Sequence, residues 1–142
     1  MTAASELPAG VTRDIVTMEA PEAPRAGAGG YPLQGFYTRP AGTMPKVALI
    51  AAHYNVDFAE HYLSALMAER GYGFLGWNTR VRGADHFFAL DRALVDVGRG
   101  VAWLREHGAQ LVDEVVQYED VYRLCYVRGP EGILIGLAEQ TG

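Results

Sequence analysis

Two apolar stretches decide the fold of this chain: residues 46–53 (KVALIAAH) and residues 72–78 (YGFLGWN). The first follows Pro45 and is apolar almost throughout, which is typical of a strand buried on both faces. We therefore expect it at the centre of a sheet. The second is shorter and equally apolar, and it predicts a neighbouring strand.

The segment between these stretches has the pattern of a helix. Asp57 can cap its start, Gly71 can end it, and we expect the helix to cover residues 61–69. The apolar residues at helical spacing are Phe58, Tyr62 and Leu66 or Met67. A strand, a helix and a strand in so short a span predict a βαβ crossover with parallel strands and a right-handed connection.

Two extended pieces precede this unit. Residues 11–18 and 33–39 partly alternate polar and apolar side chains, as strands with one exposed face do. The Pro/Gly-rich residues 21–30 between them predict a loop. We expect an antiparallel pair at the edge of the sheet.

A second helix is predicted over residues 87–107, with Gly108 as its end, although Gly98 and Gly100 weaken its middle. Its apolar stripe consists of Leu90, Leu94, Val97, Val101 and Leu104. Beyond residue 108 the pattern changes to short strands, at residues 111–117, 121–128 and 133–139, whose brief connections require antiparallel pairing. The fold class is therefore α/β: a small mixed sheet with a central βαβ unit and a C-terminal antiparallel β-meander, within one compact unit over residues 1–142.

Composition excludes several partners. The 142 residues suit one domain, and a net charge of -5 leaves no basic surface for nucleic acid. No window approaches the roughly 20 apolar residues that span a bilayer, and residues 1–10 lack the basic start of a signal peptide. Cys125 is the one cysteine, so no internal disulfide can form. We expect a cytoplasmic protein with no membrane partner.

Residues 53–55 (HYN), 69–73 (ERGYG) and 76–83 (GWNTRVRG) resemble landmarks of the α/β-hydrolase superfamily, and the resemblance covers residues 11–106. It implies ester or related acyl hydrolysis, with His53, Tyr54 and Asn55 lining the oxyanion region after the third strand. Tyr54 stands where the family often has glycine, and its bulk limits close approach of the backbone to a ligand.

The tail resembles another family. Residues 103–109 and 126–139 look like the end of a glyoxalase/bleomycin-resistance domain of the vicinal oxygen chelate superfamily, a resemblance that spans residues 100–142, with residues 107–142 as its meander. That superfamily places a metal-binding Glu in the last strand, and the position falls here on Gly136. Glu139 lies on the other face of the strand. We interpret the chain as a fusion of two incomplete domains; natural recombination, an assembly artefact and a designed sequence all stay open.

Catalytic groups are missing from the sequence. There is no Gly-x-Ser-x-Gly nucleophile motif, and the serines are Ser5 and Ser64 alone. Asp91, with Ala89 and Ala93 two residues to either side, has the small-x-Asp-x-small pattern that an aspartate nucleophile could use, but it lies in a helical pattern and is better interpreted as surface charge. The four histidines are His53, His61, His86 and His107. His53 is the best active-site candidate because it ends a strand, with a structural loop role as the alternative.

We therefore expect no catalytic residue, no metal and no cofactor. Arg80 and Arg82, with Arg92 near them in sequence, could bind an anionic small molecule, and a solvated basic loop balanced by Asp85 is the alternative. The chain is expected to be inactive as a hydrolase. A metal lyase or resistance protein of the glyoxalase type and a non-catalytic binding or dimerisation fragment are the other functions open to it. Self-association that covers exposed sheet edges is expected in any case.

Overall fold

The computed structural model describes residues 6–21, 32–83, 90–110, 116–118, 122–128 and 134–140. Its contacts divide the chain into two compact units, Met1–Ala109 and Gln110–Gly142, where the sequence led us to expect one. The boundary falls where the architecture changes from helices and strands to short strands alone. No helix among the described residues is long and apolar enough to cross a bilayer.

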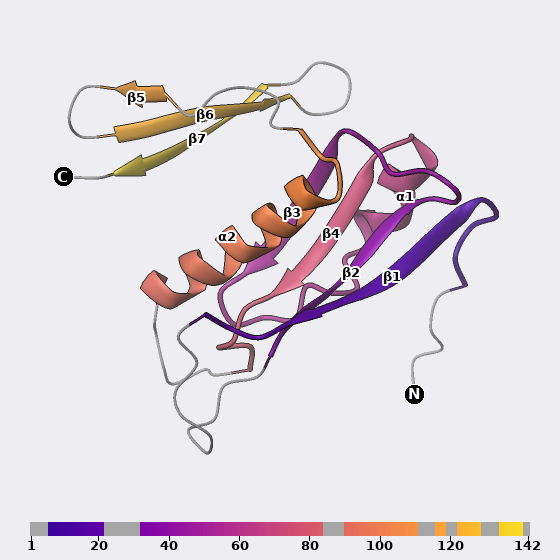
Figure 1. The fold of residues 1–142 in the computed structure, drawn as a ribbon, viewed down its shortest axis with the longest axis horizontal. Coiled ribbons are helices and arrows are strands. Elements are labelled where there is room, and N and C mark those ends of the chain that lie inside the picture. Colours follow the sequence, from indigo (N-terminus) through magenta and orange to yellow (C-terminus); the bar gives the residue numbers. More distant parts are fainter. Residues whose placement is uncertain are drawn as a thin grey trace. The chain divides into compact units, whose positions relative to one another are not determined.

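The first unit is built on a four-stranded mixed sheet in the order β1-β2-β4-β3 (Figure 1). The strands are β1 (Val11–Met18), β2 (Leu33–Pro40), β3 (Ala48–His53) and β4 (Gly73–Asn78). β1 pairs antiparallel with β2, and β2 pairs antiparallel with β4. β3 and β4 are parallel and are joined through a helix, which confirms the βαβ unit and the mixed sheet.

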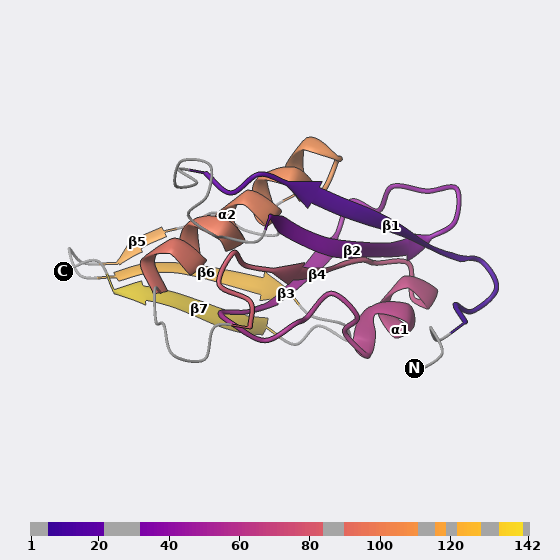
Figure 2. The same cartoon turned by 90° about the horizontal axis from the view of Figure 1, so that it is seen from below.

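β3 does not lie at the centre of this sheet, so that expectation was wrong. All six residues of β4 are buried, whereas those of β3 are half-buried up to the exposed His53. The helices lie on opposite faces of the sheet (Figure 2). A continuous apolar run indicates that both faces of a strand are covered. It does not indicate whether both edges of that strand are hydrogen-bonded to other strands.

Helix α1 (Leu63–Glu69) begins two residues later than expected, and Asp57 does not cap it. The carboxylate of Asp57 instead accepts the backbone N–H of Ala59 at 2.9 Å, which closes a turn well before the helix. The N-cap residue is Tyr62, without a capping side-chain bond, and the ring nitrogen Nδ1 of His61 accepts the N–H of Leu63 at 3.3 Å.

Helix α2 (Leu90–Glu106) buries only Leu104 of the predicted stripe. Leu90 and Leu94 are 48% and 59% exposed. The residues against the sheet are Ala93, Asp96, Gly100 and Leu104. A Cβ at Gly100 would lie 2.8 Å from Ile50 Cδ1 of β3 and 3.0 Å from Trp77 Nε1 of β4, so the missing side chain lets the helix approach both strands.

This close approach predicts opposite effects for alanine at the two glycines of α2. Gly100→Ala should lower the free energy of unfolding by about 1–3 kcal/mol, because the buried Trp77 cannot give way. Gly98→Ala should raise it by about 0.5–1 kcal/mol, because nothing lies within 4 Å and alanine favours a helix. Urea denaturation followed by tryptophan fluorescence measures both. Effects of the same sign would contradict this packing.

The core of the first unit lies between α2 and the sheet. Its buried apolar cluster comprises Val16, Leu33, Tyr37, Leu75, Trp77 and Leu104. Trp103 of α2 meets Tyr37 of β2 edge-on, with ring centroids 5.2 Å apart. Burial raises the pKa of Tyr37 above its ordinary value of 10.0, against the opposing charge of Arg39.

The second unit is an antiparallel sheet in the order β5-β6-β7. Its strands are β5 (Val116–Tyr118), β6 (Tyr122–Arg128) and β7 (Leu134–Gln140), which confirms the predicted meander. The expected hairpin turn at residues 129–132 lies outside the described residues, although Arg128 and Leu134 pair on either side of it. Gly136 pairs with Tyr126 in the same register.

Candidate functional site

The carboxyl ends of β3 and β4 form the candidate site. The two strands are parallel, so His53 at the end of β3 pairs beside Asn78 at the end of β4. The segments that follow, residues 54–62 and 79–83, must therefore leave the sheet at the same edge, the one formed by the carboxyl ends of the two strands. This carboxyl edge is where ligands bind in open α/β sheets.

His53 is held by its own loop. Its ring nitrogen Nδ1 accepts the backbone N–H of Asn55 at 3.3 Å and that of Val56 at 3.2 Å. An acceptor at Nδ1 means that the neutral ring carries its proton on Nε2. His53 thus exposes a hydrogen-bond donor to solvent, and it occupies two successive amides of the loop that the sequence assigned to an oxyanion region.

Asn78 and Asp57 anchor this loop to the sheet. The buried Asn78 side chain accepts the N–H of Phe58 at 2.7 Å through Oδ1 and donates from Nδ2 to Asp57 Oδ1 at 2.8 Å. The other oxygen of Asp57 lies 3.5 Å from the guanidinium of Arg82. One strand-end amide therefore fixes the loop through both of its polar atoms.

The same loop crosses β4 at Gly76. A Cβ at Gly76 would lie 2.3 Å from the carbonyl oxygen of Phe58 and 2.4 Å from that of Ala59. Since both atoms belong to the backbone, no side-chain rotation could relieve the contact. Glycine is required here by the crossing itself.

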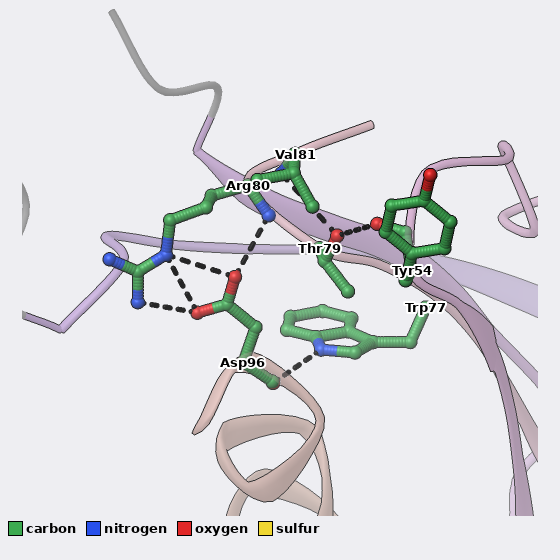
Figure 3. Close-up of polar contacts among 6 residues, drawn as sticks. All are labelled: Tyr54, Trp77, Thr79, Arg80, Val81 and Asp96. Carbon is green, nitrogen blue, oxygen red and sulfur yellow. Dashed lines mark hydrogen bonds and ion pairs between the residues drawn. The ribbon is translucent and has the colours of Figure 1, made fainter. Parts of the chain in front are cut away.

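The loops after β3 and β4 are also bonded directly to each other. The hydroxyl of Thr79 donates to the carbonyl oxygen of Tyr54 (Figure 3), and Gly83 donates its N–H to the carbonyl oxygen of Asn55 at 2.7 Å. The predicted oxyanion-region residues and the arginine-bearing turn are thus brought together. Both of these bonds are accepted by backbone oxygens.

Arg80 forms a buried ion pair with Asp96 of α2 (Figure 3). The Asp96 carboxylate accepts from Nε and from a terminal nitrogen of Arg80 at 2.6–3.0 Å, and also from the Arg80 backbone N–H at 2.9 Å. The backbone carbonyl of Asp96 accepts the indole N–H of Trp77 at 2.8 Å. This network ties the turn after β4 to the middle of α2.

These contacts bear on the predicted anion site at Arg80 and Arg82. Arg80 is only 8% exposed, and its guanidinium already holds a carboxylate in the two-pronged geometry that an anion would require. Arg82 faces Asp57. Both arginines connect parts of the scaffold in this structure, and anion binding stays a prediction.

Aromatic rings line the α1 side of the site. Phe58 stacks against His53 at 5.7 Å between ring centroids and lies 5.2 Å from His61, which in turn stacks on Phe74 at 5.2 Å. Stacking of this kind fixes the orientation of both imidazoles. The two histidines are separated by Phe58 and do not face each other.

The remaining candidates take no part in the contacts described above. His107 stacks on Trp103 at the end of α2, and Asp91 is exposed in its first turn. Ser64 is buried on α1, where Arg13 donates to it at 3.5 Å. In the part of the chain that the structure describes, no three His, Cys, Asp or Glu side chains come together as a metal site. His86, Asp85 and Ser5 lie outside the described residues.

The sequence analysis missed the residues that organise the site: Asn78, Thr79 and Asp96. A signal for Asp96 is present, because it falls at helical spacing with Ala93 and Gly100, and a carboxylate among small residues on one face indicates a buried ion pair. Asn78 and Thr79 end a wholly apolar strand, where polar side chains can bond the next loop.

Family models, curated proteins and solved structures were each compared with this chain, and none of them matches it.

Proposed function

We propose that this chain is an α/β-hydrolase-like protein that does not catalyse acyl transfer and acts as a binding scaffold. The parallel β3–α1–β4 unit, with its polar residues gathered after the two strands, supports the relation to hydrolases. In that fold an N–H from the loop after the third strand contributes to the oxyanion hole. The state of this loop therefore decides what the site can do.

The observation that carries the proposal is the bond of His53 to its own loop. The amides of Asn55 and Val56 point at Nδ1 of the imidazole, so they are not available to stabilise an oxyanion. The same bonds put the imidazole proton on Nε2, so the exposed nitrogen has no lone pair with which to accept a proton from a nucleophile. The bonding of His53 Nδ1 to its own loop thus opposes both functions that acyl transfer requires: stabilisation of an oxyanion and removal of a proton from the nucleophile.

The hydroxyl groups of Thr79 and Ser64 support the same conclusion. The Thr79 hydroxyl donates to the Tyr54 carbonyl, and Ser64 is buried against Arg13. A serine nucleophile needs a strained turn and a hydrogen bond to a base. Neither hydroxyl has such a partner among the contacts made in the described part of the chain.

A chromogenic ester assay tests the proposal. We expect the folded chain and its His53→Ala variant to hydrolyse a short-chain p-nitrophenyl ester at the same rate, equal to that of the heat-denatured protein. His107→Ala is the matched control, because it removes an imidazole far from this edge. Turnover above the denatured control that is lost in His53→Ala and kept in His107→Ala would contradict the proposal.

The second unit supports a different candidate, a metal lyase or resistance protein of the glyoxalase type. Its antiparallel β5-β6-β7 sheet is the observation in favour. Gly136 stands at the position that the resemblance assigns to a metal-binding Glu, and Glu139 lies three residues further along β7. Stoichiometric metal retained by the full chain after chelation would favour this candidate.

A cytoplasmic location and a small-molecule ligand complete the proposal. The single Cys125 makes the fold independent of an internal disulfide and so suits a reducing compartment. The ligand would lie at the carboxyl ends of β3 and β4, beside His53, Tyr54 and Asn55.

A further inference from the structure

We propose that His53 and His61 form a proton-operated switch in the loop between β3 and α1. Each neutral imidazole holds backbone amides of this loop through Nδ1, and each protonated imidazole releases them. The inference concerns the regulation of the candidate site, and it rests on the proposed function in placing a ligand beside this loop. It is carried by the hydrogen bonds of the histidines, by the anchors of the loop and by the paired charges around it.

Both imidazoles accept hydrogen bonds from backbone N–H groups. Nδ1 of His53 accepts the N–H of Asn55 at 3.3 Å and that of Val56 at 3.2 Å. Nδ1 of His61 accepts the N–H of Leu63, the first residue of α1, at 3.3 Å. An N–H group can only donate, so each ring must have a lone pair on Nδ1. These bonds therefore require neutral imidazoles with the proton on Nε2.

Protonation removes the lone pair on which these bonds depend. An imidazolium ion has an N–H on both ring nitrogens and accepts no hydrogen bond, so its Nδ1–H would face the amide N–H groups that Nδ1 had held. Histidine changes its charge between about pH 5 and 8. His53 is exposed and His61 is half-buried, so protons from solvent reach both rings. Acidification within this range therefore breaks the bonds.

Anchors on either side confine the release at His53 to a few residues. The carbonyl oxygens of Tyr54 and Asn55 are bonded to the turn after β4, and the N–H of Phe58 is bonded to the end of β4 itself. None of these bonds involves an imidazole. The amides of Asn55 and Val56 lie between the anchors, so protonation of His53 frees them without detaching the loop from the sheet.

The carboxylates of the loop are already paired with cations. Asp57 lies 3.5 Å from the guanidinium of Arg82, and Glu60 lies 3.7 Å from that of Arg13. β4, beside β3, has no titratable side chain. The other titratable side chains of the loop, of α1 with its C-cap and of the turn after β4 are Tyr54, Tyr62, Glu69, Arg70 and Arg80. Because Asp57 and Glu60 already face cations, a new ion pair does not replace the lost amide bonds.

His107 provides a control within the same chain. Its Nδ1 lies 2.8 Å from the carbonyl oxygen of Trp103, and a carbonyl oxygen can only accept, so Nδ1 carries the proton of the neutral ring. Protonation adds a hydrogen to Nε2 and leaves this bond intact. The structure therefore assigns opposite neutral tautomers: Nε2–H to His53 and His61, and Nδ1–H to His107.

NMR spectroscopy of the full chain between about pH 8 and 5 tests the switch. At the upper end of this range, the imidazole nitrogen shifts should show the assigned tautomers. As the pH falls, the exchange protection of the Asn55 and Val56 amides, relative to an unstructured peptide at the same pH, should fall about tenfold, with the midpoint of the His53 ring. The Leu63 amide should follow the His61 ring in the same way.

Asparagine variants separate the acceptor from the charge. The side-chain oxygen of asparagine takes the place of Nδ1, accepts N–H bonds from nearby residues of the chain and does not titrate. His53→Asn should keep the Asn55 and Val56 amides protected throughout the range while Leu63 still responds, and His61→Asn should do the reverse. His53→Ala should leave the Asn55 and Val56 amides unprotected at every pH. Far-UV circular dichroism checks that each variant is folded.

The possible failures of the switch and of the proposed function can be told apart. Asn55 and Val56 amides that do not follow the His53 ring, or a His53→Asn variant that responds to pH as the wild type does, would overturn the switch alone. A proton on Nδ1 of neutral His53 would overturn both the switch and the argument for the proposed function. Ester turnover together with the expected response to pH would contradict the proposed function and leave the switch standing.

Discussion

Replacing Asp96 with alanine is expected to lower the free energy of unfolding of the first unit by about 3–5 kcal/mol, the usual cost of breaking a buried ion pair. Asp96 is completely buried, and its carboxylate receives the Arg80 guanidinium and the Arg80 backbone N–H. Without it, the buried Arg80 would lose the carboxylate that its guanidinium and its backbone N–H both contact. The loss is a large share of the stability of a typical domain.

Fluorescence during urea denaturation measures this loss in the first unit alone, because both tryptophans, Trp77 and Trp103, belong to it. Asp91→Ala is the matched control, since the same change on the exposed first turn of α2 should alter stability by less than about 0.5 kcal/mol. The double variant Arg80→Met/Asp96→Leu should regain most of the loss, because it leaves no buried charge. Equal stability of the Asp96 and Asp91 variants would contradict the buried pair.

Trp77→Ala is expected to cost about 3–5 kcal/mol, as large-to-small changes of a buried aromatic residue do. Trp77 is fully buried, packs beneath α2 at Gly100 and donates its indole N–H to the backbone of Asp96. Its removal takes away the surface on which the helix rests and the hydrogen bond from the indole to the Asp96 carbonyl.

Trp103→Ala provides the comparison for this prediction. Trp103 is half-buried and meets Tyr37 edge-on, so its loss should cost clearly less than that of Trp77. Unfolding is followed by circular dichroism at 222 nm, which needs neither indole. A Trp103 variant less stable than the Trp77 variant would show that the helix depends on its C-terminal end rather than on its middle.

Much of the fold could be predicted because it follows from local patterns. The bounds of β1 and the parallel pairing of β3 with β4 come from alternation, from apolar runs and from the length of the connection. The position of β3 at the edge depends on β2 entering the sheet beside β4. The place of β2 in the sheet is set by contacts between segments that are distant in the sequence, and the alternation of polar and apolar residues does not reveal it.

The buried face of α2 could not be found from hydrophobicity. Its apolar stripe contains Leu90 and Leu94, which are exposed, whereas the sheet contacts Asp96 and Gly100. When the buried face of a helix is predicted from the spacing of its apolar residues, an aspartate and a glycine are assigned to the exposed face. Here the carboxylate is neutralised by Arg80 and the glycine gains contact by having no side chain.

The position of the candidate site could be predicted from the sequence, whereas the interactions that its residues make there could not. His53, Tyr54, Asn55, Arg80 and Arg82 do lie in neighbouring segments that the structure joins by hydrogen bonds. What each group does depends on partners such as Asn78 and Asp96, which come from other elements. Residue type and spacing indicate which side chains lie near one another. Whether a side chain is available to bind a ligand depends on the residue to which it is already bonded.

The crossing of the Phe58–Ala59 backbone over Gly76 also constrains how the protein is made. Synthesis proceeds from the N-terminus, so β1, β2 and β3 leave the ribosome before the strand to which two of them must bond. Until β4 emerges, the hairpin of β1 and β2 and the isolated β3 are separate pieces with open edges. A nascent chain is therefore most exposed to mispairing just before Gly73 appears.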